Sequence, residues 1–341
     1  MNVILQWLVL IVCLCCPLVG SNYTVFRDFS KISRSVRVPK SPVMQFYSSA
    51  NNIGNYIPVL GIQEMLGFET DTWCIHDKNI DFDFINKNYS CVIIGGAGLL
   101  HRCFDSFWKA FAEKCTLPAI VWGVGICLPH KSKQGGANKE FVKKAFAKCD
   151  LINLRDELTA KYYDVVDASI TPCPSIKYLQ RFRVRRPTTS QALLYAHHQD
   201  LVPKEFLGNM KSYCAKYKDT LHITRNALIK ETSKKSVAAF IRDNYVNQSL
   251  VISTRLHGAI IAYGLGIPYV CLSFDDKVAA FHEHFGNGVL VSDLAKLSGA
   301  IDTLLSKTAS YEPALKGVEE FGASARSWVL NKIYGNKCKM A

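Results

Sequence analysis

Residues 250–281 read LVISTRLHGAIIAYGLGIPYVCLSFDDKVAAF. The segment opens with a short apolar run that predicts a strand ending near Ser253, and the apolar stretch that follows predicts a helix at 256–265. A second strand is expected at 268–273, after a Gly-Ile-Pro turn that ends the helix. Two strands joined by a helix are typical of a parallel sheet covered by helices.

The same alternation continues on both sides of this segment. In the first half, strands are expected at 43–48, 91–95, 119–125 and 151–154, with helices at 55–67, 104–115, 139–148 and 157–163. In the second half, strands are expected at 192–197, 220–224, 249–252, 268–273 and 288–291, with helices at 203–217, 231–244, 256–265, 277–284 and 292–306. Asn55 is the expected cap of the first helix, and Pro58 is expected in its first turn.

This pattern predicts an α/β protein with two Rossmann-like domains whose parallel sheets face a cleft. Prolines and an arginine-rich stretch interrupt the alternation at 171–190, which places the domains at 43–180 and 190–310. A C-terminal helix within 311–335 is expected to pack back on the first domain. Because ligands of open α/β sheets bind beyond the carboxyl ends of the strands, a site is expected in the loops that follow the strands.

The composition narrows the classes of partner. The chain of 341 residues has a formal net charge of +13, and 49% of its residues are hydrophobic, which is enough for a buried core. A basic protein can face nucleic acid, an anionic membrane surface or an anionic small substrate. The densest basic cluster is short and is interpreted as a solvated linker, so no nucleic-acid partner is expected. This cluster comprises Arg181, Arg183, Arg185 and Arg186.

The chain begins with an apolar run at residues 3–20 that carries no charge. Its length lies between that of a signal-peptide core and that of a membrane-spanning helix. Residues 1–20 are therefore interpreted as a signal peptide or as an anchor that would associate the protein with a membrane, and a buried core helix is the third alternative. Sequons at Asn22, Asn88 and Asn247 fit the secretory pathway, for example the Golgi lumen. A bacterial envelope and the cytoplasm are the alternative locations.

Two pairs of histidines raise the question of a metal site. His282 and His284 are two positions apart, so their side chains diverge on a helix. His197 and His198 are adjacent, and the ten cysteines that follow the apolar run at 3–20 include no CxxC pair. No metal is therefore expected.

Arg255 and His257 stand at the turn between the first strand and the helix of segment 250–281. The first N–H groups of a helix are unpaired and the helix dipole is positive there, so such a turn can bind an anion. Arg255 adds a guanidinium suited to phosphate or carboxylate, and His257 adds a group that exchanges a proton near neutral pH. Lys277 follows the next strand and can reach the same anion, while Ser253 or Thr254 is expected to cap the helix. The alternative interpretation is that the histidine is only a packed or surface residue.

Several short motifs share their order and spacing with a known family. The second half contains STRLH at 253–257, AYGLGIP at 262–268 and FDDKV at 274–278. The first half contains NIGN at 52–55, VIIGGAGLL at 92–100, VWGVGI at 121–126 and LRDELT at 154–159. Together they resemble the signature of polysaccharide pyruvyl transferases over residues 43–290, with the two predicted domains in a GT-B-like arrangement.

The resemblance implies a reaction. Phosphoenolpyruvate would transfer its enolpyruvyl carbons to two hydroxyls of one hexose of a glycan, which gives a cyclic ketal and phosphate. Phosphoenolpyruvate is then a co-substrate, and no cofactor is implied. The donor would bind on the second domain, and the sugar acceptor on the first.

The resemblance also implies residue roles. Arg255 and the backbone of Leu256 and His257 would bind the donor anion, with Arg155 and Lys277 as further donor-binding cations. His257 would be the general acid, or a phosphate ligand that also shuttles the proton. Acceptor- or cleft-lining positions are implied at Asn52, Gly54, Gly95, Gly96 and Gly98. The plainer interpretations are a surface arginine at a helix start for Arg155 and tight turns for the glycines.

Two positions depart from the family pattern. Asn55 stands where the N-x-G-D motif has a carboxylate, and Ala97 replaces the third glycine of the glycine run. A non-catalytic sugar-binding relative is therefore one alternative. A nucleotide-sugar-dependent GT-B-like glycosyltransferase is the other, because its donor also carries phosphates.

Overall fold

The computed structural model describes residues 27–48, 52–128, 135–183, 192–198, 202, 204–217, 220–227, 234–286, 288–306 and 312–335. The predicted leader at 1–20, the sequon at Asn22, and Arg185 and Arg186 of the basic cluster lie outside these residues. In the ranges given, we find no helix with both the length and the apolarity needed to cross a bilayer. The nine cysteines in the same ranges are all free thiols.

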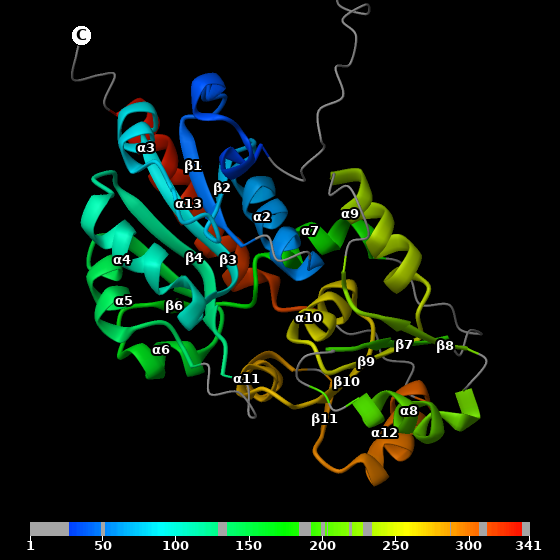
Figure 1. Cartoon of the computed structure of the whole chain (residues 1–341). Coiled ribbons are helices and arrows are strands. Elements are labelled where there is room, and N and C mark those ends of the chain that lie inside the picture. Colours follow the sequence, from blue (N-terminus) through cyan, green and yellow to red (C-terminus); the bar gives the residue numbers. More distant parts are fainter. Residues whose placement is uncertain are drawn as a thin grey trace, which may run out of the picture.

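The first half of the chain forms a six-stranded parallel sheet with the order β2-β1-β3-β4-β5-β6 (Figure 1). Its strands are β1 (Val43–Tyr47), β2 (Asp71–Cys74), β3 (Cys91–Leu100), β4 (Ala119–Ile126), β5 (Cys149–Leu154) and β6 (Ser169–Ile170). Its helices are α2 (Ile53–Leu66), α3 (Phe82–Asn88), α4 (Asp105–Lys114), α5 (Lys139–Phe146), α6 (Glu157–Tyr163) and α7 (Ser175–Leu179).

The second half forms a five-stranded parallel sheet with the order β11-β10-β9-β7-β8. Its strands are β7 (Leu193–Ala196), β8 (Leu221–Thr224), β9 (Leu250–Ser253), β10 (Tyr269–Leu272) and β11 (Val289–Val291). Its helices are α8 (Lys204–Tyr213), α9 (Lys234–Ile241), α10 (Leu256–Leu265), α11 (Asp276–Phe285) and α12 (Leu297–Ser306), followed by α13 (Leu315–Tyr334). Two parallel sheets with helices confirm the predicted fold class.

The first sheet is apolar on both faces, as a parallel sheet between two helix layers requires. Phe46 and Ile94 belong to a core shared with α3, α4 and α5, whereas Ile93 and Trp122 belong to a core shared with α2 and α13. Successive residues of a strand point to opposite faces, so one strand serves both cores.

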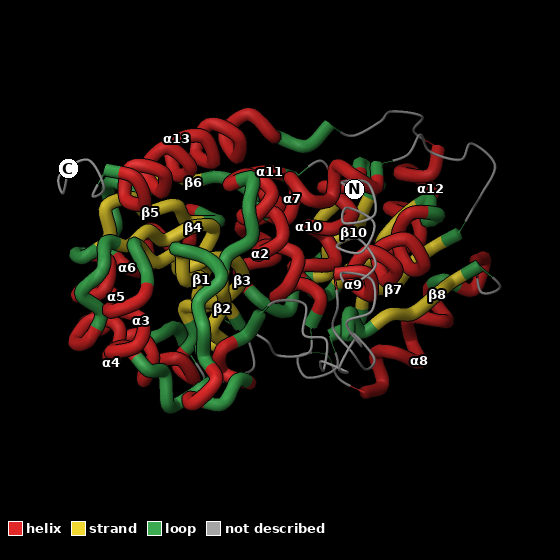
Figure 2. Tube along the Cα trace, turned by 90° about the horizontal axis from the view of Figure 1, so that it is seen from above, coloured by secondary structure: helices red, strands yellow, loops and turns green. Residues whose placement is uncertain are grey.

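Helix α13 follows the second sheet in sequence but packs on the first. Its residues Phe321, Ala325 and Val329 are buried against β3 and β4, and the rings of Phe321 and Trp122 are 5.4 Å apart. Figure 2 shows α13 running along the first sheet near β5 and β6. The chain therefore crosses between its two halves twice.

The two halves share an apolar core. It joins Ile53 and Ile57 of α2, Leu179 of α7, and Ile260 and Ile261 of α10. The backbone is linked as well, since the N–H of Ile53 donates to the carbonyl of Asn226 at 2.9 Å. Because α2 follows β1 and α10 follows β9, this packing brings the carboxyl ends of the two sheets toward each other.

The structure corrects several predicted elements. Helix α2 begins at Ile53 and is capped by Asn52, whose side chain accepts from the N–H of Gly54 at 2.9 Å, so Asn55 is not the cap and Pro58 lies inside the helix. Strand β3 continues to Leu100, beyond the predicted end at 95. The short elements β2, α3, β6 and α7 were not predicted. Strand β2 begins with polar residues, and Asp71 is stabilised by tertiary hydrogen bonds from the Tyr89 hydroxyl (3.0 Å) and the Lys40 N–H (2.8 Å).

A glycine contact between α2 and α7 gives a stability prediction. A Cβ at Gly61 would lie 2.0 Å from the backbone oxygen of Pro174, whereas a Cβ at Gly299 in α12 would meet nothing within 4 Å. We expect Gly61→Ala to lower the free energy of unfolding by ~1–3 kcal/mol because the backbone must move. The matched control Gly299→Ala should raise it by ~0.5–1 kcal/mol because alanine favours the helix. Urea unfolding of both variants tests this, and an unchanged Gly61→Ala midpoint would contradict the close contact.

A cationic pocket between the two sheets

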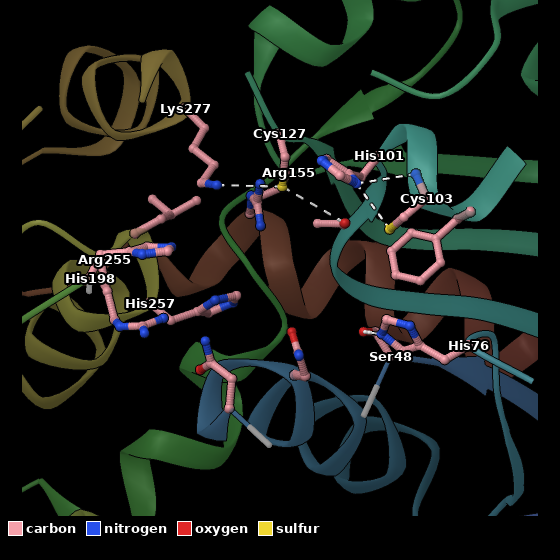
Figure 3. A pocket seen from close by; sticks show the side chains of 15 residues that line it. Ser48, His76, His101, Cys103, Cys127, Arg155, His198, Arg255, His257 and Lys277 are labelled. Atoms are coloured by element: carbon pink, nitrogen blue, oxygen red, sulfur yellow. Dashed lines mark hydrogen bonds between the residues drawn. The ribbon is translucent and has the colours of Figure 1, made fainter. Parts of the chain in front are cut away.

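A pocket opens where the strands of both sheets end. The second half contributes His198, Arg255, Leu256, His257 and Lys277. The first half contributes Ser48, Asn52, Asn55, His76, Gly98, His101, Cys103, Phe104, Cys127 and Arg155. Figure 3 shows Arg255, His198 and Lys277 on one side of the pocket, with Ser48, His76 and His101 on the other.

The turn between β9 and α10 positions Arg255. The Ser253 hydroxyl accepts from the N–H of Arg255 at 3.1 Å and donates to its carbonyl at 2.6 Å, which holds the turn in shape. The Nε of Arg255 donates to the carbonyl of His197 at 2.6 Å, which fixes the guanidinium beside the helix start. Thr254 instead accepts from the N–H of His198 at 3.0 Å. No side chain caps α10, so the prediction of a Ser253 or Thr254 cap is wrong, and the start of α10 is left open toward the pocket.

His257 lies in the first turn of α10, and its ring stands close to the start of α2. A Cβ at Gly54 would lie 2.2 Å from Cγ of His257, so only glycine lets the two elements approach this closely. The Nε2 of His257 is buried, and within the described part of the chain it has no hydrogen-bond partner. A buried polar atom without a partner is costly, and one that lines a pocket is a candidate ligand-binding group.

Arg155 stands at the turn between β5 and α6 and is only 1% exposed, so it is not a surface arginine. Its Nε lies 3.3 Å from a carboxylate oxygen of Asp156. Its Nη2 is buried and, among the residues described, unpartnered. A Cβ at Gly125 would lie 2.4 Å from Nη2, so the guanidinium rests directly on the β4 backbone.

Lys277 reaches the pocket from the start of α11. Its Nζ lies 2.7 Å from Oδ2 of Asp275 and donates to Sγ of Cys127 at 3.4 Å. Burial lowers the pKa of Lys277, but Cys127 and Asp275 outweigh burial, and the pKa is raised. Lys277 therefore stays charged inside the pocket.

The cations control the protonation of the pocket histidines. Burial first, and then Arg155, Lys277 and Arg255, hold the pKa of His257 well below its usual range. Burial and then Arg255 lower the pKa of His198 to about 3. Both rings are therefore neutral near pH 7, because each would otherwise add charge to a site that is already positive.

The structure brings some of the predicted acceptor-side residues into the pocket and not others. Asn52 and Gly98 line it. Gly54, Gly95 and Gly96 are not among the residues that line this pocket. A Cβ at Gly95 would meet Ile62 at 2.5 Å, and one at Gly96 would meet Pro58 at 2.2 Å, so both glycines let α2 pack on β3.

The glycine run also bends the strand. Gly96 and Ala97 have φ values of +79° and +71°, and the β3–β4 pairing shifts register between Ala97 and Leu100. Ala97 therefore adopts the left-handed conformation that the glycine of the family pattern would adopt more easily.

Among the pocket residues that were not predicted as site residues, five come soon after a strand. Ser48 follows β1, His76 follows β2, His101 follows β3, Cys127 follows β4 and His198 follows β7. The position of these residues at or just beyond the end of a predicted strand was the signal that could have found Ser48, Cys127 and His198. His101 was harder to find because β3 continues beyond its predicted end. His76 was out of reach because β2 itself was not predicted.

The histidine pairs do not gather as metal ligands. Throughout the described ranges, no three His, Cys, Asp or Glu side chains come together in a way that could hold a metal ion. Nδ1 of His197 bonds the Tyr195 hydroxyl at 2.9 Å, away from His198 in the pocket, and His284 lies 3.3 Å from a carboxylate oxygen of Glu157.

Comparison with solved structures supports the fold. The chain is similar to a putative UDP-N-acetylglucosamine 2-epimerase from Listeria monocytogenes, with 11% identity over 87% of this chain and 96% of that chain and a TM-score of 0.52. A Methanocaldococcus jannaschii UDP-GlcNAc 2-epimerase, solved with UDP-GlcNAc and UDP, has 12% identity over 82% and 97% of the two chains and a TM-score of 0.46. The protein thus has the GT-B-like architecture of two Rossmann-like domains.

A family model described as polysaccharide pyruvyl transferase matches residues 52–276, which contain every predicted site residue except Lys277. The chain belongs to this family. Among curated proteins, none matches this chain.

The electrostatics of the pocket give a direct test. We expect Arg155→Met to raise the pKa of His257, because removal of a nearby cation stabilises the imidazolium. Ring NMR titration of His257 measures this pKa. Arg326→Met is the matched control, since Arg326 is exposed on α13, and it should leave the pKa unchanged. An unshifted pKa in Arg155→Met would show that Arg155 does not contribute to the low pKa of His257.

Proposed function

We propose that the protein transfers pyruvate from phosphoenolpyruvate to a pair of hydroxyls on a hexose of a glycan, as a cyclic ketal. Family membership supports a pyruvyl transferase that acts on a glycan. The observation that carries the choice of donor is the convergence of Arg155, Arg255 and Lys277 on one pocket. Phosphoenolpyruvate carries a phosphate and a carboxylate, so it can satisfy several cations at once.

The donor-binding roles follow from this geometry. Arg255 and the open start of α10, including the backbone of Leu256 and His257, would hold one anionic group. The unpartnered Nη2 of Arg155 would bind the same donor from the first half. Lys277, already paired with Asp275, would act as a nearby point charge that also stabilises the departing phosphate.

The proposed reaction requires proton movements that balance. C3 of the donor accepts a proton, the first acceptor oxygen bonds to C2, and that hydroxyl loses its proton. The bond from C2 to the phosphate oxygen then breaks as the second hydroxyl adds to C2. The two hydroxyls lose two protons in total. One balances the proton that C3 gains as it becomes a methyl group, and the other leaves on hydrogen phosphate.

His257 is the proposed proton donor to C3, although its ring is neutral in the free protein. Burial and then three cations lower its pKa, and a bound donor with several negative charges would compensate the cations. Donor binding would therefore raise the pKa of His257 and load the ring with a proton. In this way the acid would form only when the donor is present.

The first test is turnover. Purified protein is incubated with phosphoenolpyruvate and acceptors that end in galactose, mannose or glucose, and released phosphate and the acceptor mass are measured. We expect acceptor-dependent phosphate release and the mass of an added pyruvate less one water. His257→Ala should lower turnover by ~100-fold or more while the protein stays folded, because a positioned acid contributes about that much.

Other outcomes of this assay separate the alternatives. Release of a nucleotide from a nucleotide sugar would favour the glycosyltransferase. Sugar binding without any turnover would favour the other alternative, a non-catalytic sugar-binding protein of the same family. Asn55 and Ala97 are the departures from the family pattern that raised this alternative. Full activity of His257→Ala would refute the role of His257 as the acid but would leave the proposed transfer reaction standing.

The second test is proton uptake. We expect phosphoenolpyruvate binding to take up protons near pH 7, because the pKa of His257 is low in the free protein and raised in the complex. The contribution of His257 to affinity should therefore grow as pH falls through the pKa of the complex, and level off below the pKa of the free protein. Calorimetry in buffers of different ionisation enthalpy measures the uptake, and His257→Ala should abolish it. Uptake that persists in this variant would assign the proton to another group.

The location proposed from the sequence has one structural support. Asn88, at the end of α3, and Asn247 are both exposed, as glycan attachment would require. We propose a secretory location on this basis, with the membrane association of the N-terminal segment as part of the same proposal.

A further inference from the structure

The pocket wall opposite the cations carries a second histidine whose surroundings suit a base. His76 follows β2 and is exposed, and its Nε2 lies 3.1 Å from the hydroxyl of Ser48, which is only 5% exposed. The ring packs edge-on against Phe104, with centroids 4.7 Å apart. One edge of the imidazole is thus held by buried groups, while the residue as a whole remains accessible.

The other pocket histidines in the described ranges are engaged differently. Nδ1 of His101 accepts the N–H of Cys103 at 3.2 Å, so the proton of the neutral ring is on Nε2, which can only donate. Nδ1 of His198 is buried and has no hydrogen-bond partner among the described residues, but the ring lies beside Arg255, where an added proton would increase the positive charge. His257 is the proposed acid. His76 is therefore the pocket histidine free to accept a proton from an incoming molecule.

The protonation of His76 is consistent with this use. The protein around the ring lowers the pKa of His76 through burial, so the imidazole is neutral near pH 7. If the buried Ser48 hydroxyl accepts the Nε2–H, then Nδ1 is left unprotonated as the acceptor atom.

We propose that His76 is the catalytic base that takes the proton from the attacking acceptor hydroxyl, and that Ser48 is a positioning residue that orients its ring. The proposal rests on the proposed function and adds the acceptor half of the chemistry. As the acceptor oxygen bonds to C2 of the donor, its O–H bond breaks and the proton moves to Nδ1 of His76. C3 takes a proton from His257 at the same time, so one proton enters and one leaves the reacting pair.

The second half of the reaction restores both rings. The second hydroxyl adds to C2 and phosphate departs. The proton held by His76 and the proton of the second hydroxyl then supply hydrogen phosphate and the ring of His257. Acid and base would thus stand on the two halves of the protein, with the reacting carbon between them.

The test compares His76→Gln with His222→Gln, an exposed histidine on β8 outside the pocket. Each variant is assayed with the acceptor that the wild-type protein pyruvylates, and phosphoenolpyruvate binding is measured separately by calorimetry. We expect His76→Gln to lose ~100-fold or more in kcat while it binds phosphoenolpyruvate with wild-type affinity and proton uptake. His222→Gln should match the wild type.

Two further measurements exclude a merely structural effect. In His76→Gly, added imidazole should restore part of the lost kcat, because the free base can occupy the vacated space. Ser48→Ala should lower kcat less than His76→Gln does, and should change the ¹⁵N shifts of the His76 ring, which report its tautomer.

The outcomes separate the two proposals. If the wild-type protein transfers pyruvate and His76→Gln has the same kcat, the assignment of His76 as the base is wrong but the proposed function stands. The same holds if His76→Gln loses as much phosphoenolpyruvate affinity as it loses kcat. Lack of imidazole rescue in a folded His76→Gly protein would also overturn it. Failure of the wild-type protein to transfer pyruvate to any acceptor would overturn the proposed function, and the base with it.

Discussion

The apolar packing of α2 against α10 holds the carboxyl ends of two separate sheets against one another. A single parallel sheet offers one row of strand ends, and here two rows meet because Ile53, Ile57, Ile260 and Ile261 share one core. Every pocket residue depends on this contact, since Arg255 and Ser48 come from different sheets. Gly54 and Gly61 matter for the same reason, because larger residues would separate the helix from its neighbours.

The meeting of the two sheets also concentrates positive charge in the pocket. The cations come from three turns, after β5, β9 and β10, and the Nζ of Lys277 lies 2.7 Å from a carboxylate oxygen of Asp275. Burial and the field of these cations keep the nearby imidazoles neutral. In the proposed function, a small anion would bind here and raise the pKa of His257, so substrate charge and residue protonation would be coupled.

The helices and strands that depend on local sequence patterns could be predicted from the sequence. The α10 helix was predicted at its observed bounds, because an apolar strand, an Arg-Leu-His turn and a Gly-Ile-Pro exit leave little choice. Strand β2 was not predicted, because Asp71 and Thr72 are polar and are satisfied only by residues distant in sequence. The packing role of Gly95 and Gly96 could not be predicted from the sequence either. Both glycines accommodate side chains of α2, which is a tertiary contact.

The return of α13 to the first sheet has a consequence for the order of synthesis. A ribosome completes β3 and β4 long before it reaches Phe321, Ala325 and Val329, which cover Ile93 and Trp122. Until α13 emerges, the first half presents an apolar face and is open to wrong association. The core of the first half is therefore completed late in synthesis, and a nascent chain stalled before α13 would be a natural client for chaperones.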